Sequence, residues 1–207
     1  MNPEFLISNV EDLESVIGVA DDFAKSKLIK KLDDPMVEFI SKSPLVFIST
    51  ITSSGSVDIS PKGDFNGFVS MLDEQTLLIP DRPGNKLAYG FRNILENSQV
   101  GLLFVIPGVR ETLRIRGSAQ ITRDPEILAS LSVDGKPAIL CTVVTVEECL
   151  FHCGKAMIRS KVWKSDSWNC QDTKFLVRQF VRTLGIESEV EVFVEQAIEE
   201  NYTNELY

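Results

Sequence analysis

The chain has 207 residues, a length that favours one domain or one domain with an appended piece. Its composition, 43% hydrophobic and 25% charged, is that of a globular protein, and no apolar run approaches the roughly 20 residues that cross a bilayer. The net charge of −9 argues against nucleic acid as a partner, because duplex binding requires a clustered basic surface. Met1–Glu4 lack the basic start and apolar stretch of a signal peptide, so we expect a cytoplasmic protein.

The acidic charge is concentrated near the C-terminus. Seven Glu and no Lys or Arg follow Arg182, and we interpret this tail as a solvated helix surface. The four cysteines have no zinc-site spacing, and the chain has one histidine. Cys141, Cys149 and Cys153 lie in or beside one apolar stretch and are predicted to be buried strand cysteines.

Residues 1–43 are predicted to be helical. Ser8 and Glu11 have the spacing of a capping box ahead of an apolar periodic segment. A second helix is expected to extend through Leu28, Ile29 and Leu32, and a third to begin at Asp34-Pro35. The expected N-terminal caps are Ser8, Asp21 or Asp22, and Asp34.

From Pro44 the pattern changes to strands. The apolar run 45–48 predicts a buried strand, and the turn residues 53–56 predict a hairpin into a second strand. In that second strand Val57 and Ile59 should share one face, with Asp58, Ser60 and Lys62 on the other. Residues 68–81 hold two more strand pieces joined at Asp73-Glu74, and 84–97 have the apolar periodicity of a helix.

The second half predicts further strands and two more helices at the end. The predicted segments are an apolar strand at 100–106, a strictly alternating strand at 112–122, a short helix from 124 to 131, a closing strand at 138–151, and helical patterns at 176–184 and 190–198. About six strands with one central helix and few crossovers indicate a mainly β, α+β fold. We expect an antiparallel barrel with helices packed outside, because closure removes exposed strand edges.

Three polar clusters could carry chemistry. Residues 79–86 join a strand to a helix start, where Arg82 could grip a phosphate bidentately and Lys86 adds charge. The alternative is a turn in which Asn85 is an ordinary helix cap. Two interpretations of residues 58–64 are open: a bulged strand beside a ligand, or a solvated edge strand. The third cluster, 151–156, contains His152, which is either catalytic or structural.

Several enzyme classes lack their motifs here. Ser60 does not lie in a GxSxG motif, which argues against a serine hydrolase. The chain has neither a GxGxxG nor a P-loop pattern, which argues against folds that bind dinucleotides or nucleoside triphosphates.

Five segments occur in an order typical of one family. They are SPKGD at 60–64, LIPDRPGNK at 78–86, RNIL at 92–95, VGLLFVIPG at 100–108 and HCGKA at 152–156. Together they resemble the pyridoxamine 5′-phosphate oxidase-like family of FMN-binding split-barrel proteins, in its branch with PKGD and IPDRPGN stretches. The resemblance covers about residues 10–168.

This resemblance implies a six-stranded antiparallel FMN-binding split barrel over residues 44–168. An N-terminal helical segment, 1–43, precedes it, and a C-terminal helical extension, 169–207, follows. It further implies a homodimer with two FMN molecules at the subunit interface. The cofactor residues that it implies are Arg82, Asn85 and Lys86 for the phosphate; Ser60, Pro61 and Lys62 along the flavin ring; Thr112 with Arg114 or Arg116; and His152, Lys155 and Trp168 reaching the cofactor of the other subunit.

The resemblance implies an FMN-dependent oxidoreductase with a small-molecule substrate and possible reduction by a nicotinamide nucleotide. Oxidases of vitamin B6 phosphates carry a substrate-binding Tyr/Arg/Ser set, whereas residues 123–137 here have no Tyr. The resemblance therefore does not extend to that substrate. The alternatives are a flavin-binding sensor or carrier without turnover, and a deazaflavin-dependent reductase in the same cleft.

Overall fold

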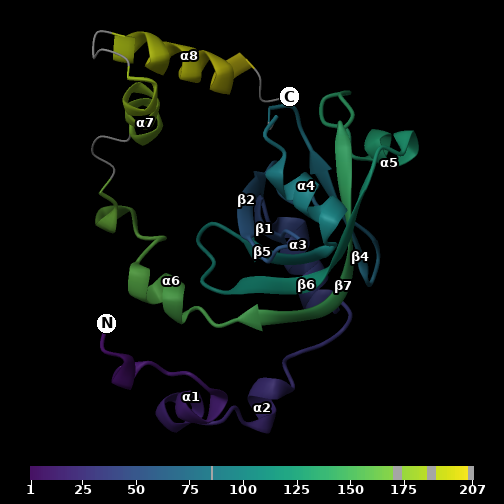
Figure 1. Cartoon of the computed structure of the whole chain (residues 1–207). Coiled ribbons are helices and arrows are strands. Elements are labelled where there is room, and N and C mark those ends of the chain that lie inside the picture. Colours follow the sequence, from purple (N-terminus) through teal and green to yellow (C-terminus); the bar gives the residue numbers. More distant parts are fainter. Residues whose placement is uncertain (85, 170–173, 186–189, 205–207) are drawn as a thin grey trace.

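A curved antiparallel sheet with helices around it forms the body of the protein (Figure 1). The computed structural model describes residues 1–84, 86–169, 174–185 and 190–204. The strand order is β2-β1-β5-β6-β7-β4-β3. The strands are β1 (Leu45–Ile51), β2 (Val57–Gly63), β3 (Ser70–Asp73), β4 (Thr76–Asp81), β5 (Gln99–Val105), β6 (Thr112–Thr122) and β7 (Leu140–His152). The mainly β, α+β fold is as expected, with seven strands rather than six, and β2 and β3 lie at the two edges of the sheet. The two strand pieces expected within residues 68–81 are β3 and β4.

Eight helices occur in the described residues, in addition to short 3₁₀ turns at Pro3–Phe5 and Ser165–Ser167. They are α1 (Val10–Ile17), α2 (Asp22–Lys25), α3 (Asp34–Lys42), α4 (Tyr89–Glu96), α5 (Pro125–Ser130), α6 (Lys155–Ser160), α7 (Phe175–Leu184) and α8 (Glu191–Asn204). Within these residues, none of the helices has both the length and the apolar character that a bilayer crossing requires.

The N-terminal helices begin at different caps from those expected. Asn9, not Ser8, caps α1 by accepting the amide of Asp12 at 2.8 Å, and Asp33, not Asp34, caps α3. Asp21 caps α2, as predicted. The prediction that the second helix extends through Leu32 was wrong, since α2 ends at Lys25.

The segment after α2 bonds to the sheet instead of continuing the helix. Ile29 pairs with Cys149 of β7, and the amide of Leu32 donates to Glu74 in the turn between β3 and β4. These bonds to strand residues compete with helical bonds and replace them. The segment therefore covers part of β7 that β4 does not reach.

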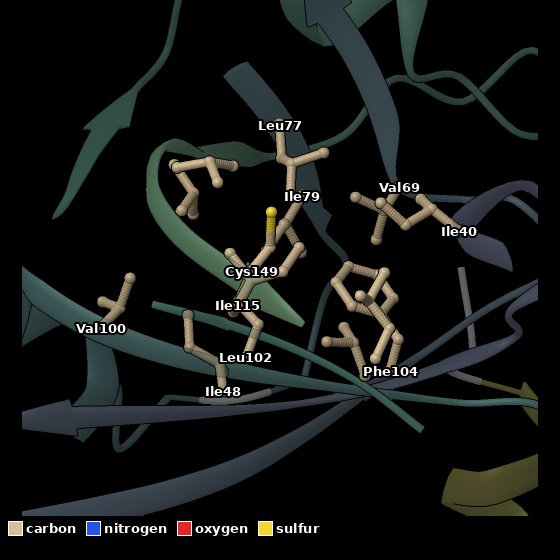
Figure 2. Packing of buried hydrophobic residues seen from close by; sticks show 14 of the residues in the cluster. Ile40, Ile48, Val69, Leu77, Ile79, Val100, Leu102, Phe104, Ile115 and Cys149 are labelled. Atoms are coloured by element: carbon tan, nitrogen blue, oxygen red, sulfur yellow. The ribbon is translucent and has the colours of Figure 1, made fainter. Parts of the chain in front are cut away.

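The core fills the inside of the curved sheet. Ile48, Leu102, Phe104, Ile115 and Cys149 converge there, and α3 closes one end with Ile40 (Figure 2). A second, smaller cluster around Cys141 and Leu131 lies under α5. Cys141 and Cys149 are buried, as predicted.

Cys153 is exposed, so the prediction that it is a buried strand cysteine was wrong. It lies just beyond the last residue of β7, His152, where the strand no longer holds it in the core. The fourth cysteine, Cys170, lies outside the described residues.

The C-terminal helices make their most extensive contact with each other. Val177 of α7 is buried, and Lys174 forms an ion pair with Glu195 of α8 at 2.7 Å. Gly185 ends α7 with φ 62°, a left-handed conformation that suits glycine. Figure 1 shows this helical pair set apart from the sheet.

Candidate functional site

Strand β2 turns its polar face inward and its apolar face outward. Val57 and Ile59 are 65% and 64% exposed, whereas Asp58, Ser60 and Lys62 are half-buried. The predicted division into two faces is confirmed. β2 is an edge strand, and its register with β1 is unbroken from Val57 to Gly63, so the bulge considered for this segment is not formed. The polar face is not solvated, because α4 covers it with Gly90 and Phe91. The exposed apolar face of β2 is a surface of the kind that a partner or ligand covers.

Two buried ion pairs join the end of β2 to the end of β4. We call the four residues Lys62, Asp64, Asp81 and Arg82 the charge clasp. Lys62 bonds Asp81, and the Nε of Arg82 donates to the Oδ2 of Asp64 at 3.0 Å. The side chains are 2% to 17% exposed, so each charge depends on its partner. The clasp thus links the SPKGD segment to the IPDRPGN segment.

The sequence had singled out both cations of the clasp but neither of its carboxylates. Lys62 and Arg82 were expected to bind the cofactor, and the structure brings them together. The signal for the missing partners was present, since each motif contains one cation and one aspartate. Only the fold pairs them crosswise, between strands that are not hydrogen-bonded neighbours in the sheet.

The phosphate-binding residues expected at a helix start lie in a loop instead. Helix α4 begins at Tyr89, so Arg82 and Lys86 precede its first turn. The reason is conformational, because Gly84 has φ 127° and Ala88, the N-cap, is left-handed at φ 54°. Asn85, the cap considered from the sequence, lies outside the described residues. Lys86 is exposed.

The space between α4 and the sheet is too small for a flavin. It has a volume of about 20 Å³ and is lined by Thr50, Ser60, Lys62 and Phe91, among others. The ammonium of Lys62 lies 4.9 Å from the ring centroid of Phe91, a cation–π contact that fills the remaining room. This space therefore has no room for a ring system.

The outer face of β2, β1, β5 and β6 carries a cavity of the right size. Its volume is about 690 Å³, within the range of about 300–1,000 Å³ for small-molecule sites. Phe47 and Leu103 form an apolar floor beside Ile59. Arg114 and Arg116 also line the cavity, and both donate to Glu148, at 3.3 Å and 3.1 Å. Two arginines around one carboxylate leave a net positive charge over an apolar surface.

The other predicted cofactor residues lie at separate places in the structure. Thr112 is buried in β6 and pairs with His152, which is exposed and lines the outer-face cavity. Pro61 is exposed on the same side of β2 as Ile59. Lys155 begins α6 and is exposed. Trp168 is 56% exposed, and its indole donates to the carbonyl of Val162 at 2.7 Å.

Within one chain, Lys155 and Trp168 do not line the outer-face cavity. They lie on the segment that leaves the end of β7 and continues to the C-terminal helices (Figure 1). The structure therefore gathers Ser60, Lys62 and Arg82 at the clasp side, and Arg116 and His152 at the cavity. It leaves Lys155 and Trp168 apart from both groups.

The buried cysteines are poor nucleophiles. Burial raises the pKa of the Cys141 thiol to about 11, and burial together with the nearby carboxylates of Asp33 and Glu148 raises the pKa of Cys149 to about 11. Cys149 also donates its thiol to the carbonyls of Ile29 and Lys31. Since the thiolate is the reactive form, both residues are structural.

The sequence matches a family model, that of pyridoxamine 5′-phosphate oxidase, over residues 32–153. The chain belongs to the pyridoxamine 5′-phosphate oxidase family. The matched segment runs from just before α3 to just after the end of β7 and includes both the charge clasp and the outer-face cavity. The family expected from the motifs is confirmed. No curated protein matches the sequence.

Solved structures of similar fold come from several bacteria. HupZ of Group A Streptococcus has 17% identity and a TM-score of 0.47, covering 57% of this chain and 91% of its own. A protein of Clostridium acetobutylicum related to general stress protein 26 has 16% identity and a TM-score of 0.43, with coverage of 59% and 91%. An FMN-binding protein of Syntrophomonas wolfei has 14% identity and a TM-score of 0.42, with coverage of 55% and 86%.

Proposed function

We propose that this protein is an FMN-dependent oxidoreductase that acts on a small molecule. The observation that carries the proposal is the outer-face cavity, whose apolar floor and two arginines suit a flat ring with a polar, electron-rich edge. Family membership supports a flavin as the ligand. When bound, FMN would supply the hydride transfer, while the protein binds, orients and shields the reacting groups.

Two groups of residues would hold such a cofactor, one at the end of β4 and one at the outer-face cavity. Arg82 and Lys86 would hold the phosphate, Arg82 through its guanidinium fork and Lys86 as a point charge. Pro61 and Ile59 would contact the ring along β2, where the cavity already has an apolar lining. Arg116 would place positive charge near the ring, which favours the reduced, anionic form of a flavin.

We further propose that the working unit is a homodimer. Val57 and Ile59 expose an apolar face, and Ile59 also lines the cavity. A second copy would cover both, and it would bring its own Lys155 and Trp168 towards the ligand, whereas His152 lines the cavity of its own chain. This accounts for the separation of Lys155 and Trp168 from the cavity of their own chain.

The first test is the absorption spectrum of the purified protein. Bands of an oxidised flavin that bleach under anaerobic NADH or NADPH would support a flavin-dependent oxidoreductase reduced by a nicotinamide nucleotide. Flavin bands that neither nicotinamide nucleotide bleaches would favour a sensor or carrier. A deazaflavin spectrum, or binding of deazaflavin in preference to FMN, would overturn the cofactor assignment.

A further inference from the structure

Hydrogen bonds to both its backbone and its side chain hold Asp64 in place. Its amide donates to the carbonyl of Pro44 at 3.1 Å, which ties its backbone to the start of β1. Its Oδ1 accepts the amide of Phe65 at 2.9 Å, and its Oδ2 accepts the Nε–H of Arg82 at 3.0 Å. With a side chain only 2% exposed, Asp64 is a rigid acceptor rather than a surface charge.

The bond to Asp64 uses the inner nitrogen of Arg82. A guanidinium has five N–H donors in one plane, and the four on its two Nη atoms take no part in this bond. Fixing Nε fixes the plane of the whole group, because the guanidinium is rigid. Asp64 thereby sets the direction in which Arg82 can offer a pair of parallel N–H groups to an oxyanion.

We infer that Asp64 is a positioning residue that holds Arg82 ready for the phosphate of the cofactor. The inference rests on the proposed function, in which Arg82 binds that phosphate. Without Asp64, Arg82 would have to lose its side-chain freedom on binding, and the free energy of binding would be reduced by that ordering cost. With Asp64, the ordering is complete before the ligand arrives.

Electrostatics alone predicts the opposite effect, which makes the inference testable. Asp64 is an anion, so by charge alone it repels a phosphate, and its removal should strengthen FMN binding. A purely structural role predicts that losing Asp64 weakens FMN and riboflavin equally. Positioning predicts that Asp64→Asn weakens FMN while riboflavin, which lacks the phosphate, is unaffected.

The experiment measures the affinity of flavin-free protein for FMN and for riboflavin by quenching of flavin fluorescence. For Asp64→Asn we expect the ratio of the two affinities to fall about three- to tenfold against wild type. Asp64→Glu keeps the ion pair but shifts the carboxylate by one methylene, so it should lower the ratio even if Asp64→Asn does not fold. In an Arg82→Ala background, Asp64→Asn should leave the ratio unchanged.

Asp124→Asn is the matched control. Its carboxylate accepts the amides of Glu126 and Ile127 at the start of α5, it lies outside the site, and the substitution changes the net charge by the same amount. The control should keep the wild-type ratio. Tighter FMN binding by Asp64→Asn, or equal losses for both flavins, would overturn the positioning role. Wild-type protein that binds neither flavin would overturn the proposed function, and the role of Asp64 with it.

Discussion

The exposed apolar face of β2 is the proposed dimer interface, so substitutions on it test dimerisation directly. We expect Ile59→Glu to dissociate the proposed dimer. Fully burying an isoleucine side chain stabilises by about 1.5–3 kcal/mol. Ile59 is 64% exposed in the single chain, so covering it stabilises by about 1–2 kcal/mol per copy.

A two-fold interface contains each residue twice, so the loss for the dimer is about 2–4 kcal/mol. This corresponds to a rise in the dimer dissociation constant of about 30- to 900-fold. The value is a lower bound for glutamate, because an interface would also have to desolvate two like charges. The exposed starting position means that the fold of the single chain should be unaffected.

Sedimentation velocity over a dilution series, with and without FMN, measures the dissociation constant directly. Leu72→Glu is the matched control, since Leu72 is 67% exposed on β3 at the opposite edge of the sheet. The control should remain as associated as wild type. A wild-type protein that stays monomeric with FMN present, or an Ile59→Glu variant with an unchanged dissociation constant, would refute the assignment of this face.

Four further outcomes are expected. Arg82→Ala should weaken FMN binding by about 10- to 150-fold and leave riboflavin binding unchanged, because a charge-assisted bond to phosphate is worth about 1.5–3 kcal/mol. Fluorescence titration with the two flavins measures this, and equal losses for both would contradict it. Truncation after Gly185 removes α8, which packs on α7. Because the 10-residue α7 is too short to remain helical alone, the far-UV circular dichroism signal should fall by the helical content of both α7 and α8. A decrease that matches α8 alone would contradict this expectation. Iodoacetamide should modify Cys153 in the native protein and spare Cys141 and Cys149, as peptide mass mapping would show. Burial raises the pKa of both thiols to about 11, whereas in the unfolded state they ionise at the ordinary thiol pKa of about 8.5. Above that pH only the unfolded state loses protons, so the free energy of unfolding should fall as the pH rises towards about 11. A free energy of unfolding that stays constant over this pH range would contradict the effect of burial.

Local sequence determined most of the elements, because periodicity and turn chemistry are properties of neighbouring residues. The strict alternation at 112–122 became β6 with the same bounds, and Asp124-Pro125 opened α5. The sequence predicted a helix from residue 84, but α4 begins at Tyr89. Its boundary depends on a left-handed Ala88, a conformation that alanine rarely adopts and that no pattern in the sequence signals.

Tertiary structure decided what the polar residues do. The alternation in β2 established two faces, but it could not say that the polar face would be buried under α4 and the apolar face left open. Lys62 and Arg82 were visible as cations, yet their partners Asp81 and Asp64 lie 18 or 19 residues away along the chain and meet them only when β2 and β4 approach. A sequence pattern records which side of a strand a residue occupies, whereas the free energy of a buried charge depends on the group that the fold places opposite it.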